Sequence, residues 1–296
     1  MAHDPQVLAT DEPLALSAPL AARLAQAQCR LDPAVGWSCA WSHGFWQYLR
    51  LLGLAVTPDR HAAFLQSALA EVADSRPRAR LLISGAVDYA MLAQVAAVWH
   101  GRGAMPEITV LDICDTPLEL NRWYAERSGF NIRTVKADIL EFASPRPFDA
   151  ICTHAFLGFF DHARRKSLAA KWYSLLSTGG RAITVHRLRP GESELVLFTE
   201  NQIQAYVETV TATARGIAPL PGLDDAALAG LAERYARRLR FYAVPTLHYV
   251  DALFRQAGFA IERLFAAPLG GNVKTAGSAS TVPGDNPYFH LVATRR

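Results

Sequence analysis

The stretch RLLISGAVDYAML, residues 80–92, carries the clearest structural signal in this chain. Leu81, Leu82 and Ile83 form an apolar run of the kind that is buried on both faces of a parallel sheet, and apolar residues then recur at helical spacing. Gly85 lies between the two patterns, where a residue without a Cβ lets the backbone approach a ligand and the following helix offers unpaired N–H groups. We expect a strand, a tight turn and a helix, and either a ligand-binding turn or an ordinary connection between them.

The next unit repeats this pattern and ends its strand in an acid. Ile108–Leu111 is predicted as a strand with Asp112 as its last residue, and a capping box that starts at Thr116 predicts a helix that ends at Gly129. A carboxylate at that strand end, roughly 20–30 residues after the glycine turn, can accept hydrogen bonds from both ribose hydroxyls of a nucleoside cofactor. Dinucleotide and adenosyl cofactors both fit this spacing.

Two further strands also end in candidate binding residues. Asp138 follows a third strand and is positioned to reach the exocyclic amine of an adenine, with Ile139 able to cover the ring; an exposed loop acid is the alternative. Phe148–Thr153 is a fourth strand, and His154 and Phe156 follow at its carboxyl end, where open α/β sheets bind ligands.

The order of these motifs resembles that of class I S-adenosylmethionine (SAM)-dependent methyltransferases, over about residues 78–296. The resemblance is carried by SGAVD (84–88), VLDIC (110–114), KADIL (136–140), FDAICTH (148–154), LLSTGGRAITV (175–185) and the terminal NPYFHLVATRR (286–296). It implies an α/β fold with a Rossmann-like seven-stranded methyltransferase sheet, mostly parallel with an antiparallel last strand between the fifth and sixth, and SAM as the cofactor. The contacts to SAM that it implies are Ser84, Gly85, Asp88, Asp112, Ile113, Asp138, Ile139, His154 and Phe156.

The glycine turn departs from the usual pattern of that family. Where the family has an acid and then glycines at alternate positions, this chain has Ile83, Gly85, Val87 and Tyr89. The acid that usually pairs with the ammonium group of SAM is therefore absent. We expect Asp88 or a neighbouring backbone carbonyl to take that role.

The segments outside the sheet suggest a covered crevice. Residues 1–75 are predicted as a helical N-terminal cap, and residues 76–296 as the SAM-binding domain with a helical insertion at about 188–245. Trp37 and Trp41 of the aromatic cap and Tyr242 of the insertion are candidate substrate contacts, since aromatic faces attract cationic groups. A cap whose aromatics are simply core, and an insertion that forms a homodimer contact, are the alternatives.

Composition narrows the class of protein. The 296 residues are 51% hydrophobic, enough for a full core, and no apolar run approaches the roughly 20 residues that span a bilayer. The polar start lacks the pattern of a signal peptide, so we expect a cytoplasmic protein without a membrane partner. Its net charge of +3 is dispersed, which does not favour nucleic acid. Four cysteines, Cys29, Cys39, Cys114 and Cys152, show no CxxC spacing, so buried free thiols are expected rather than disulfides or a metal site.

These observations favour methylation of a small molecule of natural-product or secondary metabolism, at oxygen or nitrogen. His154 is the first candidate for the catalytic base because of its place at the strand end, and His43 is a weaker one. A SAM-using enzyme that releases methylthioadenosine by cyclisation or elimination, and a non-catalytic binding protein of the same fold, remain alternatives. A nicotinamide-dependent oxidoreductase is disfavoured by the missing G-x-G-x-x-G pattern.

Overall fold

The structure is a computed structural model that describes residues 7–32, 36–192, 194–217, 219–268 and 287–296, without the side chains of Asp32 and Trp37. The α-helices are α1 (Leu14–Gln28), α2 (Ala40–Leu51), α3 (Ala62–Ser75), α4 (Ala90–Trp99), α5 (Asp115–Ser128), α6 (His162–Leu175), α7 (Glu200–Arg215), α8 (Asp225–Arg238) and α9 (Leu247–Gln256). Two 3₁₀ helices are η1 (Pro58–His61) and η2 (Leu157–Phe159). The strands are β1 (Leu31–Asp32), β2 (Trp37–Ser38), β3 (Arg80–Ser84), β4 (Glu107–Asp112), β5 (Ile132–Lys136), β6 (Phe148–His154), β7 (Leu176–Arg187), β8 (Leu195–Val196), β9 (Phe241–Tyr242), β10 (Phe259–Ala267) and β11 (Tyr288–Arg295).

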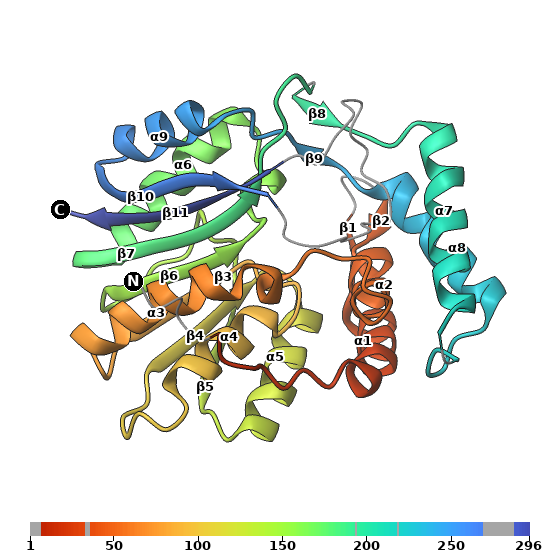
Figure 1. Ribbon diagram of the computed structural model, residues 1–296, viewed down its shortest axis with the longest axis horizontal. Helices are drawn as coiled ribbons and strands as arrows, with labels where there is room; N and C mark the ends of the chain where they lie inside the picture. The colour runs from red at the N-terminus through yellow and green to blue at the C-terminus, as the bar shows by residue number, and fades with distance from the viewer. Residues whose placement is uncertain (1–6, 33–35, 193, 218, 269–286) are drawn as a thin grey trace, which may run out of the picture.

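A seven-stranded sheet in the order β10-β11-β7-β6-β3-β4-β5 forms the centre of the molecule (Figure 1). Strand β3 pairs in parallel with β4 and β6, whereas β11 lies antiparallel between β7 and β10. This arrangement confirms the predicted sheet, including its antiparallel last strand. The carboxyl ends of β3, β4, β5 and β6 consequently meet at one edge.

Helices cover both faces of the sheet, as the alternation of side chains along β3 requires. Leu81 and Ile83 belong to a buried cluster with residues of α3, α4 and α5, whereas Leu82 belongs to a second cluster with residues of α6 and α9. All three side chains are at most 1% exposed. Strand β3 is therefore buried on both faces, as its unbroken apolar run predicted.

Helix α3 packs on the sheet. Its residues Phe64, Leu65 and Leu69 share the buried cluster of Leu81 and Ile83. The predicted boundary at residue 75 would thus separate α3 from the sheet that it covers, and the division into two domains stays a prediction.

Helices α1 and α2 pack instead against the insertion, with α7 and α8 beside them at the right of the view (Figure 1). One buried cluster joins Phe45, Tyr48 and Leu49 of α2 to residues of α7 and α8, among them Tyr206 and Tyr235. The aromatic cap and the insertion therefore form one packed unit. No helix in the described residues is long and apolar enough to cross a membrane.

The start of α5 differs from the prediction. The predicted capping box from Thr116 to Glu119 is wrong, because α5 begins at Asp115 with Cys114 as its N-cap and no side-chain cap bond. Thr116 is buried in the first turn, where its hydroxyl lies 3.3 Å from the sulfur of Cys29. A contact with α1 therefore replaces the cap. At its other end α5 stops at Gly129 with φ +71°, as predicted.

Candidate functional site

Backbone hydrogen bonds join the loops after β3, β4 and β5 at the carboxyl edge of the sheet. The amide of Gly85 donates to the carbonyl of Leu111 at 3.0 Å, and the amide of Ala137 donates to the carbonyl of Asp112 at 3.0 Å. The glycine turn and the acid at the end of β4 are therefore held side by side, as a nucleoside site requires.

Asp112 is half-buried at the end of β4, and its Oδ1 accepts a hydrogen bond from the Cys114 amide at 2.9 Å. Burial raises the pKa of this carboxyl to about 6, and the neighbouring His43 acts in the opposite direction. The next residue, Ile113, is 69% exposed. A carboxylate beside an exposed apolar side chain suits a ribose and its attached base.

Asp138 and Ile139 follow β5. The carboxylate of Asp138 accepts from the Leu140 amide at 2.9 Å and lies 3.7 Å from Arg164 of α6. Ile139 is only 2% exposed and packs in the core with Leu82. The side chain of Ile139 therefore packs inside the protein beneath the strand ends. Of Ile113 and Ile139, the exposed Ile113 is better placed to cover the adenine ring.

The glycine turn is closely covered by an aromatic ring. Gly85 has φ +70°, and a Cβ built there would lie 2.2 Å from ring carbons of Phe156. Ala155, which precedes Phe156, is the single non-glycine residue with positive φ (+53°) in the described chain. Beside the turn, the buried hydroxyl of Ser84 has no hydrogen-bond partner. Strained backbone and unsatisfied polar atoms are typical of functional sites.

Asp88 holds α2 against this turn. Its Oδ2 accepts hydrogen bonds from side chains of α2: Trp46 at 2.8 Å, Gln47 at 2.9 Å and Arg50 at 2.9 Å. Its Oδ1 accepts from the Ala90 amide at 2.8 Å, at the start of α4. An ammonium group would have to compete with these donors for Asp88.

Imidazoles gather where β6 ends and β11 begins. The ring centroids of His61 and His154 lie 5.4 Å apart, and a ring nitrogen of His290 lies 3.0 Å from one of His61. Each of these three histidines has one buried ring nitrogen that finds no hydrogen-bond partner among the described residues. His61 and His290 were not predicted as site residues, although His290 interrupts an otherwise apolar terminal strand.

Burial lowers the pKa of His154 to about 3, and nearby His186 and His290 act in the same direction. Burial likewise lowers the pKa of His186 to about 3. Both rings are neutral at pH 7. His154 is therefore a hydrogen-bond partner for a substrate and a weak proton acceptor.

The other sequence-predicted residues lie elsewhere. His43 contacts sulfur, with its Nδ1 3.4 Å from the Sγ of Cys29. Trp41 packs edge-on against Tyr235 at 5.4 Å and lines a pocket of about 330 Å³ between α1, α2 and α8. Tyr242 lies in β9, where its carbonyl accepts from Arg165 at 2.6 Å. The side chain of Trp37 lies outside the described residues.

A family model described as a methyltransferase domain matches residues 90–180, which include Asp112, Asp138 and His154. No curated protein matches the chain.

Several solved structures are similar to it. A proposed sarcosine dimethylglycine methyltransferase from Galdieria sulphuraria is 14% identical with a TM-score of 0.52, and the match covers 84% of this chain and 96% of that one. Magnesium protoporphyrin IX methyltransferase from Synechocystis PCC 6803 is 14% identical with a TM-score of 0.49, covering 87% and 96%. A didemethyltoxoflavin N1-methyltransferase from Burkholderia thailandensis is 16% identical with a TM-score of 0.48, covering 79% and 78%.

The sheet with its antiparallel last strand and the matched domain define the class of protein. Residues 90–180 carry a methyltransferase domain, and they lie on the sheet that the resemblance to class I SAM-dependent methyltransferases implied. The matched domain supports a transferase with SAM as its cofactor, as predicted from the sequence.

Proposed function

We propose that this enzyme transfers the methyl group of SAM to a small molecule. The observation that carries the proposal is the grouping of Gly85, Asp112 and Ile113 at one edge of the sheet, with half-buried His154 at the end of β6, whose neighbour is β3. The packed unit of α1, α2, α7 and α8 supports a small substrate, because its pocket of about 330 Å³ lies in the lower range of small-ligand sites.

In this proposal the chain acts mainly by alignment. SAM supplies the electrophilic methyl group. Asp112 accepts hydrogen bonds from the ribose hydroxyls, and Ile113 packs on the base. Asp138 accepts a hydrogen bond from the exocyclic amine of the adenine. Transfer then needs a nucleophile held in line with the methyl group, because orientation supplies much of the rate.

His154 is the proposed partner of the acceptor. Its neutral ring accepts a hydrogen bond from a substrate hydroxyl or amine, and a pKa of about 3 makes it weaker than a base matched to neutral pH. We therefore expect His154→Ala to lower turnover by roughly 10²-fold, at the low end of the range for a positioned base. SAM affinity should be unchanged. Wild-type turnover at saturating substrate would remove His154 from the mechanism, and His162→Ala, at an exposed position of α6, is the matched control.

The product of SAM tests the reaction type. The purified enzyme is incubated with methyl-labelled SAM and the low-molecular-mass fraction of a cell extract, and the nucleosides are identified by mass spectrometry. Label in a small product together with S-adenosylhomocysteine is expected. Label confined to the macromolecular fraction would contradict the proposed substrate class.

A second reaction is favoured by Asp88. It is the single acid of the 80–92 stretch, and its carboxylate is already bonded to α2 and α4. Without a carboxylate partner, the amino group of SAM can lose its proton to solvent and attack its own Cγ. The Cγ–S bond breaks as the N–Cγ bond forms, and methylthioadenosine is the leaving group. Methylthioadenosine as the only nucleoside product would establish this reaction in place of methyl transfer.

A non-catalytic binding protein of the same fold is the remaining alternative. Calorimetry that shows no micromolar binding of SAM or S-adenosylhomocysteine would favour it.

A further inference from the structure

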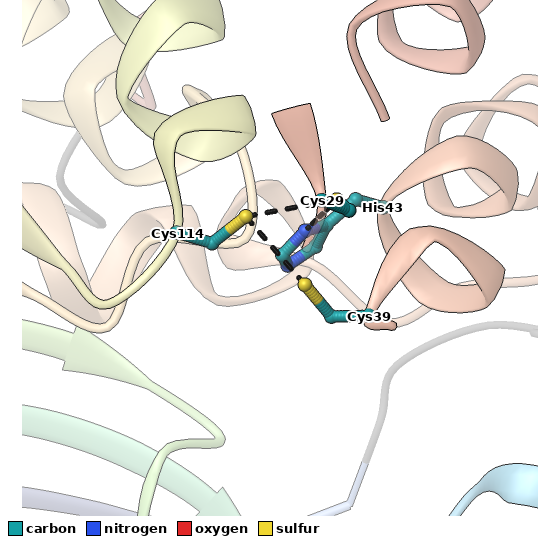
Figure 2. A group of neighbouring side chains, drawn as sticks. All are labelled: Cys29, Cys39, His43 and Cys114. Atoms are coloured by element: carbon teal, nitrogen blue, oxygen red, sulfur yellow. Dashed lines mark hydrogen bonds between the residues drawn. The ribbon is translucent and has the colours of Figure 1, made fainter. Parts of the chain in front are cut away.

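Three cysteines and a histidine meet where the N-terminal helices touch the sheet domain. Cys29 follows α1, Cys39 precedes α2, His43 lies in the first turns of α2, and Cys114 precedes α5. Figure 2 shows these four side chains pointing toward one another. The sequence predicted buried free thiols rather than disulfides or a metal site. The thiols are free, but Cys29 and Cys39 are only half-buried, and three of the four cysteines gather around His43.

Three of the six separations between the ligand atoms are close to those of a tetrahedron around one ion. The sulfur of Cys114 lies 3.6 Å from that of Cys29 and 3.5 Å from that of Cys39. Nδ1 of His43 lies 3.4 Å from the Cys29 sulfur, and all four ligand atoms lie within 4.8 Å of one another. Zinc bonds of about 2.3 Å to sulfur and 2.0–2.1 Å to nitrogen place tetrahedral ligands about 3.8 Å (S–S) and about 3.5 Å (S–N) apart.

The local backbone also suits thiolates. Cys39 and Cys114 are the N-cap residues of α2 and α5, where unpaired backbone N–H groups favour negative charge. Neither helix has a side-chain cap bond, so both sulfurs are left for another role. The Thr116 hydroxyl, 3.3 Å from the Cys29 sulfur, can donate to a thiolate and orient it.

The ligand set selects the metal. Three sulfurs and one imidazole favour zinc over magnesium or calcium, which prefer oxygen. Four protein ligands fill a tetrahedral site, which is typical of structural zinc rather than catalytic zinc.

We propose that Cys29, Cys39, His43 and Cys114 bind one structural zinc ion that fastens α1 and α2 to the β4–α5 junction. Three ligands come from the cap and one comes from the loop that also carries Asp112. The Cys114 amide donates to Asp112, so the ion holds the backbone of the proposed ribose site. This last consequence rests on the proposed function, whereas metal binding does not.

Metal content is the first test. The full chain, purified without an affinity tag of histidines, is analysed for zinc by mass spectrometry and titrated with cobalt(II) alone. One zinc per chain and the absorption bands of tetrahedral thiolate-bound cobalt are expected. Cys114→Ser and His43→Gln should lose both signals, and Cys152→Ser, at a buried thiol of β6 outside the cluster, should keep them.

A second measurement covers variants that fail to fold. Zinc is removed from the wild-type chain with a chelator under reducing conditions, and its Tm is measured before and after zinc alone is restored. A Tm that falls and recovers supports the proposal. An unchanged Tm together with absent cobalt bands would overturn it, as would equal metal loss in Cys152→Ser. A disulfide between two of the cluster sulfurs in freshly purified protein, seen as a loss of two hydrogens by intact mass, would also overturn it.

Binding of S-adenosylhomocysteine separates the zinc proposal from the proposed function. The zinc-loaded and zinc-free chains are compared by calorimetry with S-adenosylhomocysteine. Weaker binding without zinc is expected. A zinc-loaded chain that binds no S-adenosylhomocysteine would count against the proposed function alone, and equal affinity in both forms would overturn the link between the ion and Asp112.

Discussion

The orientation of the Asp112 carboxylate is set by the backbone at the end of β4. The amide of Cys114 orients one carboxylate oxygen, and exposed Ile113 follows directly. Charge-assisted hydrogen bonds from a ribose to such a carboxylate are stronger than those between neutral groups. The affinity for SAM should therefore depend on this charge.

Asp112→Asn is predicted to weaken SAM binding by ~1–3 kcal/mol, because it removes the charged acceptor and keeps the shape of the side chain. Isothermal calorimetry measures the change. Asp115→Asn is the matched control, since Asp115 lies three residues further on and pairs with Lys136. Equal affinities for wild type and Asp112→Asn would show that β4 does not carry the ribose contact.

Gly85 and Phe156 form a second residue-level pair. A side chain at φ +70° costs ~1–2 kcal/mol, and here the new Cβ would also overlap the Phe156 ring. Gly85→Ala should therefore lower the free energy of unfolding by more than the backbone cost alone. In the double variant Gly85→Ala/Phe156→Ala the overlap is gone, so the combined loss should fall short of the sum by ~0.5–3 kcal/mol. Urea unfolding of the four proteins measures this coupling, and additive losses would contradict the contact.

The elements show what the sequence could predict. The end of β4 at Asp112, the stop of α5 at Gly129 and the helices α7 and α8 within the predicted insertion all agree with the predictions. Each depends on local signals, namely apolar periodicity and a helix-ending glycine. The start of α5 was wrong because its Thr116 is held by a sulfur 87 residues away in sequence.

Long-range contacts explain most of what the sequence missed at the site. Asp88 was predicted to face a ligand, and it lies bonded to three side chains of α2. His61 and His290 are 229 residues apart and meet only because η1 packs beside the start of β11. Residue types and spacings carry no information about such pairs. The roles of all sequence-predicted site residues in binding or catalysis stay predictions.

The buried histidines at the ends of β6 and β7 predict a stability that depends on pH. Burial lowers the pKa of His154 and His186 to about 3 from an ordinary value of 6.5. The unfolded chain therefore binds protons below about pH 6.5 that the folded chain does not bind. The stability contributed by the neutral rings is fully present above that pH and is lost as the pH falls toward 3.

Each ring should contribute up to ~1.4 kcal/mol per pH unit to this loss. Urea unfolding between pH 7.5 and 5, chosen to span the unfolded-state pKa of about 6.5, measures the slope. His154→Gln should flatten it, and the same change at exposed His162 should not. Identical slopes for wild type and His154→Gln would contradict a neutral buried ring at this position.

At the level of the whole molecule, α1 and α2 connect three parts that are distant in sequence. Asp88 binds α2 to the glycine turn, the cysteine–histidine cluster lies against the β4–α5 loop, and an aromatic cluster joins α2 to α7 and α8. Helices α1 and α2 therefore contact both the proposed nucleoside site and the α7–α8 insertion that is proposed to cover the substrate. A mutation in the aromatic cluster alone should change the affinity for the acceptor substrate and leave the affinity for SAM unchanged.

Tyr235 of α8 tests this separation. It is 8% exposed, stacks on Tyr206 at 5.9 Å and meets Trp41 and Phe45 edge-on at 5.4 and 5.5 Å. Tyr235→Ala should lower stability by ~3–5 kcal/mol, as large aromatic truncations in a core do. Because α7 and α8 have no strand of the main sheet beneath them in the described chain, the loss should be local, with faster amide hydrogen exchange in these two helices and unchanged exchange in β3 and β4. The KM for the acceptor should rise while SAM affinity stays the same, and Tyr235→Phe, which keeps the ring contacts, should behave like wild type. Exchange that quickens equally in the sheet and in α7–α8 would show that the cap, the insertion and the sheet unfold together, and that substrate cover and cofactor site cannot be altered independently.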